Sequence, residues 1–184
     1  MNHQIVTHPS LFVPWDIEMA RINFGANCGP VSFAVATHQE VCPVMQHFRH
    51  FEHHRWTNLT QMRRAFRSVG LQTVLLRRRL PDYGVALIQW LGPWTLRDFY
   101  SPWSLIYTHW IAVNHGEVYD HTVGSWHPLS YWESEIAPSI LKTKRLSTGW
   151  TVKYGLQAPH PQSACKGSLH SARIPSSSDF SFLS

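Results

Sequence analysis

A cysteine that opens an apolar run has the setting of a nucleophile. Cys28 is followed by Gly29 and Pro30, and then by small or apolar residues up to His38. Pro30 suits the first turn of a helix, and apolar residues all round predict a buried one. A thiol at a helix start lies beside unpaired N–H groups and the positive end of the helix dipole, which lower its pKa. Cys28 is therefore a candidate nucleophile, and the alternative is a small buried core cysteine. Gly29 is a candidate cleft residue, because it lets a substrate approach the backbone.

A histidine and an aspartate are spaced to meet across a β-hairpin. Two runs, 105–113 and 117–122, flank Asn-His-Gly at 114–116, which is typical of a hairpin turn. A two-residue turn pairs Asp120 with Ile111, which lies two residues after His109. The side chains of His109 and Asp120 are then diagonal neighbours on one face of the hairpin. Such neighbours are about 7–8 Å apart at the backbone, within reach of a carboxylate and an imidazole. A three-residue loop would break this parity. The alternative is a half-buried His beside an exposed Asp.

Together these two elements resemble the papain-like cysteine peptidase superfamily. Asn27-Cys28-Gly29-Pro30 at a helix start is followed about eighty residues later by a strand His and a hairpin Asp. The similarity is to the bacteriocin-leader-processing peptidases and the phytochelatin-synthase type, and it covers roughly residues 20–155 in order and type of element. It implies a bacterial or phage hydrolase with Cys28 as nucleophile, His109 as general base and acid, and Asp120 as orienting carboxylate.

One position departs from the pattern of that family. Its members place an oxyanion-stabilising Gln six residues before the Cys, where this chain has Ile22. Asn23 and Asn27 are the amides available to donate beside the N–H of Cys28, and Asn23 is favoured. Losing one such donor typically lowers the rate by about 10²–10³.

The resemblance implies acyl transfer through a thioester on Cys28. Water as acceptor gives a peptidase or amidase, and another acceptor gives an acyl or deamidating transferase. We expect a peptide or protein substrate, no cofactor and no metal. Trp110 and Trp126 are further cleft candidates, and Trp126 is a candidate to shelter the His109–Asp120 pair from water. The missing Gln favours an alternative, a catalytically silent module that binds a protein partner as an effector or inhibitor.

The order of the expected helices and strands predicts an α+β fold, in which N-terminal helices pack on an antiparallel sheet and together position these residues. Helices are expected at 28–38, 43–54, 59–69 and 132–141, strands at 71–76, 85–90, 105–113, 117–122 and 149–154, and irregular chain at 1–27. Residues 1–156 form the expected catalytic domain. Residues 157–184, rich in Ser, Pro and His, form the expected flexible tail.

Composition indicates the number of domains, the chemistry of the cysteines and the expected location of the protein. The chain has 184 residues, 43% of them hydrophobic, which is enough for one packed domain. Its three cysteines form no CxxC pair, which disfavours a zinc ribbon or a disulfide framework. We find no signal peptide and no apolar run that approaches the length of a membrane span, so the expected location is the cytoplasm, away from membranes.

Two clusters of charged or titratable residues offer competing functions. A histidine-rich run carries either a metal site or, as we favour, a solvated face; it comprises His47, His50, Glu52, His53 and His54. A basic group could bind nucleic acid, but no nucleic-acid motif frames it, so this partner is disfavoured and an acidic protein is the alternative. It comprises Arg63, Arg64, Arg67, Arg77, Arg78 and Arg79.

Overall fold

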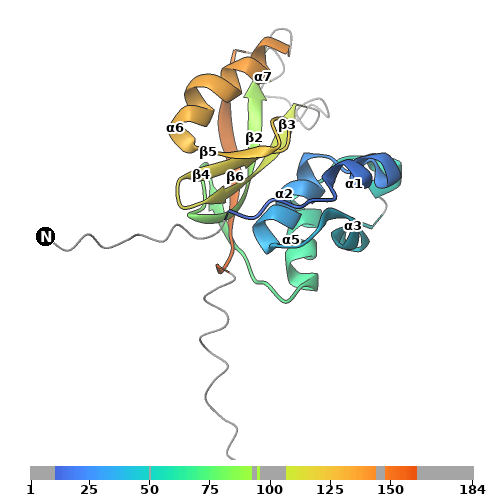
Figure 1. Ribbon diagram of the computed structural model, residues 1–184. Helices are drawn as coiled ribbons and strands as arrows, with labels where there is room; N and C mark the ends of the chain where they lie inside the picture. The colour runs from blue at the N-terminus through green and yellow to red at the C-terminus, as the bar shows by residue number, and fades with distance from the viewer. Residues whose placement is uncertain (1–10, 50, 93–94, 96–106, 144–147, 161–184) are drawn as a thin grey trace, which may run out of the picture.

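Helices on both faces of one antiparallel sheet make up the fold (Figure 1). The computed structural model describes residues 11–49, 51–92, 95, 107–143 and 148–160. The helical elements are α1 (Ile17–Phe24), α2 (Cys28–Thr37), α3 (Val41–Val44), the 3₁₀ helix η1 (Met45–His47), α4 (Phe51–His54), α5 (Leu59–Ser68), α6 (Leu129–Tyr131), the π-helix η4 (Trp132–Ile136) and α7 (Ala137–Thr143). The strands are β1 (Val74–Arg77), β2 (Tyr83–Leu91), β3 (Thr108–Asn114), β4 (Glu117–Asp120), β5 (Ser125–Pro128) and β6 (Gly149–Gln157). The α+β class with N-terminal helices is therefore confirmed.

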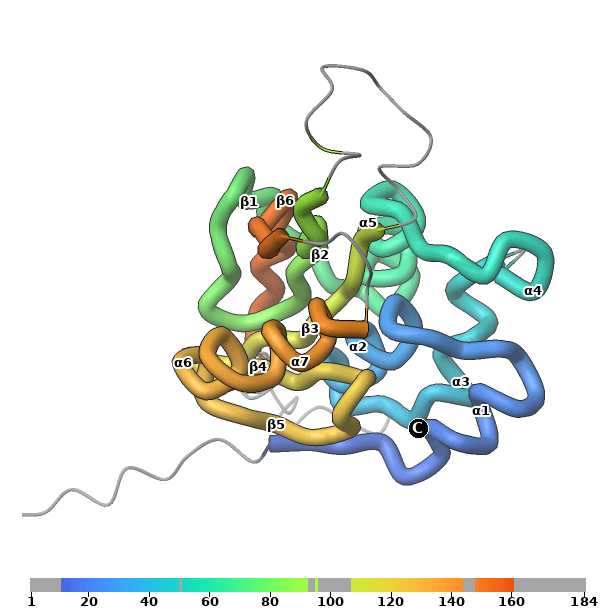
Figure 2. Tube along the Cα trace, turned by 90° about the horizontal axis from the view of Figure 1, so that it is seen from above, coloured from blue at the N-terminus to red at the C-terminus, as the bar shows by residue number. Residues whose placement is uncertain are grey.

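The sheet separates two hydrophobic cores. Its strand order is β1-β6-β2-β3-β4-β5, and every neighbouring pair is antiparallel. The N-terminal helices lie on one side and α6 to α7 on the other, as two views at right angles show (Figures 1 and 2). Along β3, Trp110 and Ala112 join the core with α2, whereas Ile111 and Val113 join the core with η4 and α7. Strand β3 is thus held from both faces.

Helix α2 begins at the cysteine, as predicted. Asn27 is its N-cap, and the Asn27 side-chain oxygen accepts a hydrogen bond from the Gly29 N–H at 3.2 Å. All eight residues from 29 to 36 are buried. This helix is apolar all round because it lies under the sheet and between other helices. Burial on every side fixes where its first residue, Cys28, lies.

The β3–β4 hairpin turns as the sequence predicts. His115 and Gly116 both have positive φ, 47° and 88°, which is the conformation of a type I′ turn. Asn114 pairs with Glu117, so the two-residue turn preserves the predicted parity. The side chains of His109 and Asp120 therefore share a face, the one that packs on η4 and α7.

Several expected elements differ in the structure. Residues 17–24 form α1 and not irregular chain, because Pro14 precedes the first turn and Gly25 ends the helix with φ 67°. The expected helix at 43–54 is broken, since Phe48 has the non-helical angles φ −108° and ψ 65°. Strand β5 was not expected at all. Strand β6 inserts between β1 and β2, which are therefore not neighbours.

The end of the predicted domain lies slightly further along the chain. Strand β6 extends to Gln157, and the buried Ala158 donates its N–H to the carbonyl of Tyr83 at 2.9 Å. The rest of the expected tail, 161–184, lies outside the described residues. No helix in the described part of the chain is long and apolar enough to cross a bilayer.

A buried aspartate connects the start of α1 to the start of α3. Asp16 is 2% exposed, and its two carboxylate oxygens accept hydrogen bonds from the N–H groups of Val41 and Cys42, both at 2.7 Å. These are the first N–H groups of α3, so Asp16 caps that helix from a distance in sequence.

We predict that Asp16→Ala lowers the free energy of unfolding by about 2–3 kcal/mol, because two buried N–H groups lose a charged acceptor. Urea denaturation measures the change. The control is Glu18→Ala, which removes an exposed carboxylate from the same helix and should change the free energy by less than about 0.5 kcal/mol. Equal effects of the two substitutions would contradict this role of Asp16.

Candidate active site

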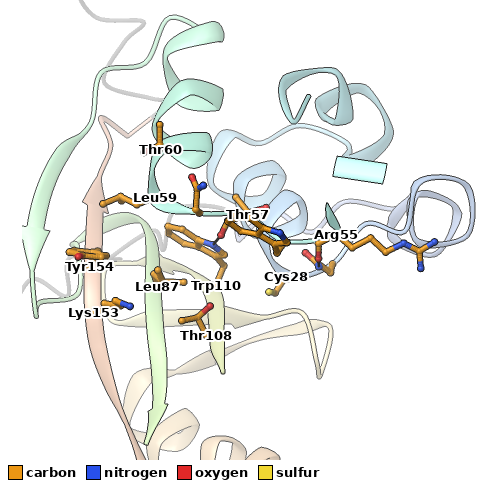
Figure 3. Close-up of a pocket in the computed structure, with 13 residues that line it drawn as sticks. Cys28, Arg55, Thr57, Leu59, Thr60, Leu87, Thr108, Trp110, Lys153 and Tyr154 are labelled. Atoms are coloured by element: carbon orange, nitrogen blue, oxygen red, sulfur yellow. Dashed lines mark hydrogen bonds between the residues drawn. The ribbon is translucent and has the colours of Figure 1, made fainter. Parts of the chain in front are cut away.

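The sulfur of Cys28 lies at the edge of a pocket of about 750 Å³ (Figure 3). Cys28 is the first residue of α2 and is half-buried. The pocket continues from it between the 55–60 segment and strands β2, β3 and β6. A nucleophile at this position would therefore meet a substrate that fills the pocket.

The His109–Asp120 pair forms at hydrogen-bonding distance. His109 Nε2 lies 2.9 Å from Asp120 Oδ1, and the Asp120 side chain is completely buried. The carboxylate also accepts hydrogen bonds from the Thr122 N–H at 2.8 Å and the Trp132 indole N–H at 2.9 Å. Burial alone would raise the Asp120 pKa, but the charge of His109 and these hydrogen bonds lower it below its usual range. Asp120 is thus a buried carboxylate that stays ionised.

His109 joins the carboxylate to the thiol. Because Nε2 faces Asp120, Nδ1 is the nitrogen left to exchange a proton with the nearby Cys28. Burial opposes protonation of His109, but the negative charges of Cys28 and Asp120 outweigh it and raise the His109 pKa to about 10. Burial likewise raises the Cys28 pKa, yet the His109 charge, its hydrogen bond and the Trp110 backbone N–H lower it overall. The geometry favours a thiolate beside an imidazolium.

Two tryptophans that the sequence did not point to enclose the pair. The ring of Trp90 lies 6.1 Å from that of His109, and Trp132 donates to Asp120. The role given to Trp126 is wrong, because Trp126 pairs with Tyr119 across β4 and β5 and so faces away from Asp120. Side chains alternate between the two faces of a strand. Alternation along the 85–90 run would therefore have placed Trp90 on the face of His109, had the pairing of these two strands been known. No local spacing indicates Trp132.

The two asparagines expected to stabilise the oxyanion have different surroundings, and of the two only Asn27 lines the pocket of Cys28. The Asn27 amide N–H donates to the Arg55 carbonyl at 2.7 Å, while its oxygen caps α2. Asn23 is exposed on α1 and lines a second pocket with Ile22, not the pocket of Cys28. The Asn27 oxygen caps α2 because the first N–H groups of a helix need a hydrogen-bond acceptor. The backbone N–H of Cys28 itself is the donor closest in sequence to the sulfur.

The two remaining cleft candidates have different surroundings. Trp110 lines the pocket, and its indole N–H donates to the Thr57 carbonyl at 2.8 Å, which fixes the ring. Gly29 is buried instead, and a Cβ there would lie 2.3 Å from Thr57 Oγ1. Glycine is therefore required for packing against Thr57 and not for the approach of a substrate.

The described histidines of the 47–54 run contact nearby side chains, and the arginines are mostly exposed. His47 is hydrogen-bonded to Ser68, His53 lies beside Glu52, and the rings of His54 and Trp56 are 6.0 Å apart. His50 lies outside the described residues, among which no group of three His, Cys, Asp or Glu side chains is placed to hold a metal ion. The arginines lie on α5 and around the end of β1, and all but the half-buried Arg63 are exposed.

Comparisons of the chain with protein-family models, with curated proteins and with solved structures found no match. The chemistry assigned to this site therefore depends on the geometry of its own residues.

We predict that iodoacetamide at pH 6–7 alkylates Cys28 on the order of tenfold or more faster than Cys42. The charge of His109 lowers the Cys28 pKa, whereas burial and the Asp16 carboxylate raise the Cys42 pKa. Peptide mapping by mass spectrometry resolves the two sites and Cys165, which lies outside the described residues. His109→Ala should slow the labelling of Cys28 alone. Equal rates at all cysteines would mean that Cys28 is not activated.

We also predict that Asp120→Asn flattens the acid dependence of stability. Because the folded-state pKa of Asp120 is lowered, its contribution is present above about pH 3.9 and is lost as the pH falls through the folded-state value. The free energy of unfolding of the wild type should thus fall more steeply below pH 4, by at most about 1.4 kcal/mol per pH unit for this proton. Urea titrations at a series of pH values give both slopes, and parallel slopes would contradict the buried-carboxylate role.

Proposed function

We propose that this chain is a cysteine-dependent hydrolase with a papain-like fold that cleaves a peptide or amide bond through a thioester on Cys28. The observation that supports it most is that His109, which is hydrogen-bonded to Asp120, lies near enough to Cys28 for each to shift the pKa of the other, at the edge of an open pocket. The order of elements, helices first and an antiparallel sheet second, agrees with what the resemblance implies.

In the proposed reaction, the Cys28 thiolate attacks the carbonyl carbon of the scissile bond. The C–N bond breaks as His109 gives its Nδ1 proton to the leaving nitrogen, and the acyl group remains on sulfur as a thioester. His109 then removes a proton from water, the hydroxide attacks the thioester, and the thiolate leaves beside the reprotonated imidazole. Asp120 keeps Nε2 protonated throughout, so Nδ1 is always the nitrogen that exchanges protons with substrate.

The developing oxyanion would be stabilised by the backbone N–H of Cys28, since the Gly29 N–H is bonded to the Asn27 side chain and Pro30 has no N–H. The position of the family Gln is occupied by Ile22, whose side chain is 70% exposed. One donor fewer lowers the rate by about 10²–10³, so we expect a slower enzyme than a papain-like peptidase with a complete oxyanion hole.

The same position favours a second candidate function, a papain-like module that has lost turnover and binds a protein partner. The exposed Ile22 could contact such a partner, because it replaces a polar catalytic side chain with an apolar one. An acyl or deamidating transferase differs only in the acceptor that resolves the thioester, and the described residues do not select among acceptors.

We predict that the wild-type protein generates new peptide N-termini in a proteome-derived peptide library and that Cys28→Ala does not. Mass spectrometry identifies the products, and added hydroxylamine should yield hydroxamates, because it attacks the carbonyl of the Cys28 thioester and releases the thiolate. Asp120→Asn should lower the rate by as much as about 10⁴, since the imidazole loses its orienting partner. Identical product sets from the wild type and Cys28→Ala would refute the hydrolase and favour the silent binding module.

A further inference from the structure

A β-bulge places a lysine in the pocket of Cys28. Leu87 of β2 pairs with Tyr154 of β6, but the next residue, Ile88, pairs with Val152. Lys153 is therefore an extra residue in β6. In a regular strand, neighbouring side chains point to opposite faces, whereas here Lys153 and Tyr154 both line the pocket. The bulge redirects a side chain that strand alternation would otherwise turn away.

Lys153 has no carboxylate partner within the described structure. Its side chain is half-buried, no described ion pair involves it, and the described residues that line the pocket include no Asp or Glu. Burial lowers the Lys153 pKa, as is usual for a cation removed from water without an anion beside it. A cation in such a place gains most from a ligand that brings a negative charge.

Lys153 is also the cation whose charged end faces the pocket. Figure 3 shows its ammonium group directed inward, whereas the guanidinium of Arg55 points away from Cys28 and Trp110. A Cβ at Gly25 would lie 3.4 Å from Arg55 Nε, so the arginine head lies against the end of α1. The positive charge inside the pocket therefore comes from Lys153.

The remaining walls of the pocket combine polar and apolar side chains. The apolar ones are two indole rings, two leucines and a phenol ring: Trp56, Trp110, Leu59, Leu87 and Tyr154. A volume of about 750 Å³ lies within the range of sites that enclose small ligands or several side chains. The pocket thus combines an aromatic wall with one buried positive charge.

We propose that this pocket selects an acidic peptide segment, in which a carboxylate pairs with Lys153 while an adjacent aromatic or large apolar side chain packs against Trp56, Trp110 and Tyr154. Lys153 is thereby a specificity-determining residue. The inference rests on the proposed function, because it takes the occupant of the pocket to be the peptide substrate of Cys28.

Binding without turnover tests this inference. The probes are three pools of synthetic octapeptide amides that carry Phe beside a fixed Glu, Gln or Lys, in either order, among otherwise random residues. Immobilised full-length Cys28→Ala protein captures them, and mass spectrometry counts what is retained. We expect the Glu pool to be retained about tenfold more than the isosteric Gln pool at low salt, and the ratio to fall at high salt.

Substitutions at Lys153 identify the source of the preference. In the Cys28→Ala background, Lys153→Glu should reverse the preference toward the Lys pool, and Lys153→Met should remove the difference between Glu and Gln. Lys142→Glu, an equal charge change on the exposed surface of α7, should leave the preference intact. Should Lys153→Glu fail to fold, as its thermal unfolding would show, Lys153→Met alone decides.

Each outcome bears on a distinct claim. Equal retention of the Glu and Gln pools, retention of none, or a preference that survives substitution of Lys153 would overturn the acidic specificity. The hydrolase is judged separately, by incubating the same pools with the wild type. Selective capture without cleavage would keep the acidic pocket and refute the hydrolase, whereas cleavage that ignores charge would keep the hydrolase and refute the acidic pocket.

Discussion

The buried carboxylate of Asp120 is the constraint on which the site depends. A completely buried anion is tolerated only when donors surround it, and here the donors come from three places: the His109 ring on β3, the Thr122 N–H after β4 and the Trp132 indole on η4. The sheet and the π-helix must both be in place for the carboxylate to remain charged. That charge in turn raises the His109 pKa, and the charge of His109 lowers the Cys28 pKa.

Each of the two hydrophobic cores positions a different part of the site. The core with α2 fixes the sulfur, through burial of the whole helix, the Asn27 cap and the close packing of Gly29 on Thr57. The core with η4 and α7 fixes the carboxylate. Strand β3 belongs to both, and its residues His109 and Trp110 face opposite sides at the point where the cores meet. A single two-sided strand therefore sets the geometry between the nucleophile and its base.

Local rules were enough for the parts of the site that lie close together in the chain. The start of α2 followed from Pro30 and the apolar run, and the His109–Asp120 relation followed from the parity of a two-residue turn. Features that depend on distant partners were not accessible. Trp132 reaches Asp120 from another element, Asp16 caps α3 from 25 residues away, and the bulge at Lys153 exists only through the pairing of β6 with β2. The side-chain oxygen of Asn27 meets a local need that the sequence does indicate, the cap of α2.

The interaction between Cys28 and His109 also determines how His109 can act as an acid in the proposed reaction. An imidazole with a pKa of about 10 is a poor acid at neutral pH, yet His109 must protonate a leaving nitrogen. The charge of the Cys28 thiolate is a main cause of that raised pKa, and this charge disappears as the S–C bond forms. His109 therefore becomes a stronger acid when the proton is needed, while Asp120 continues to orient the ring. When the thioester is hydrolysed, the returning thiolate restores the ion pair and the resting state.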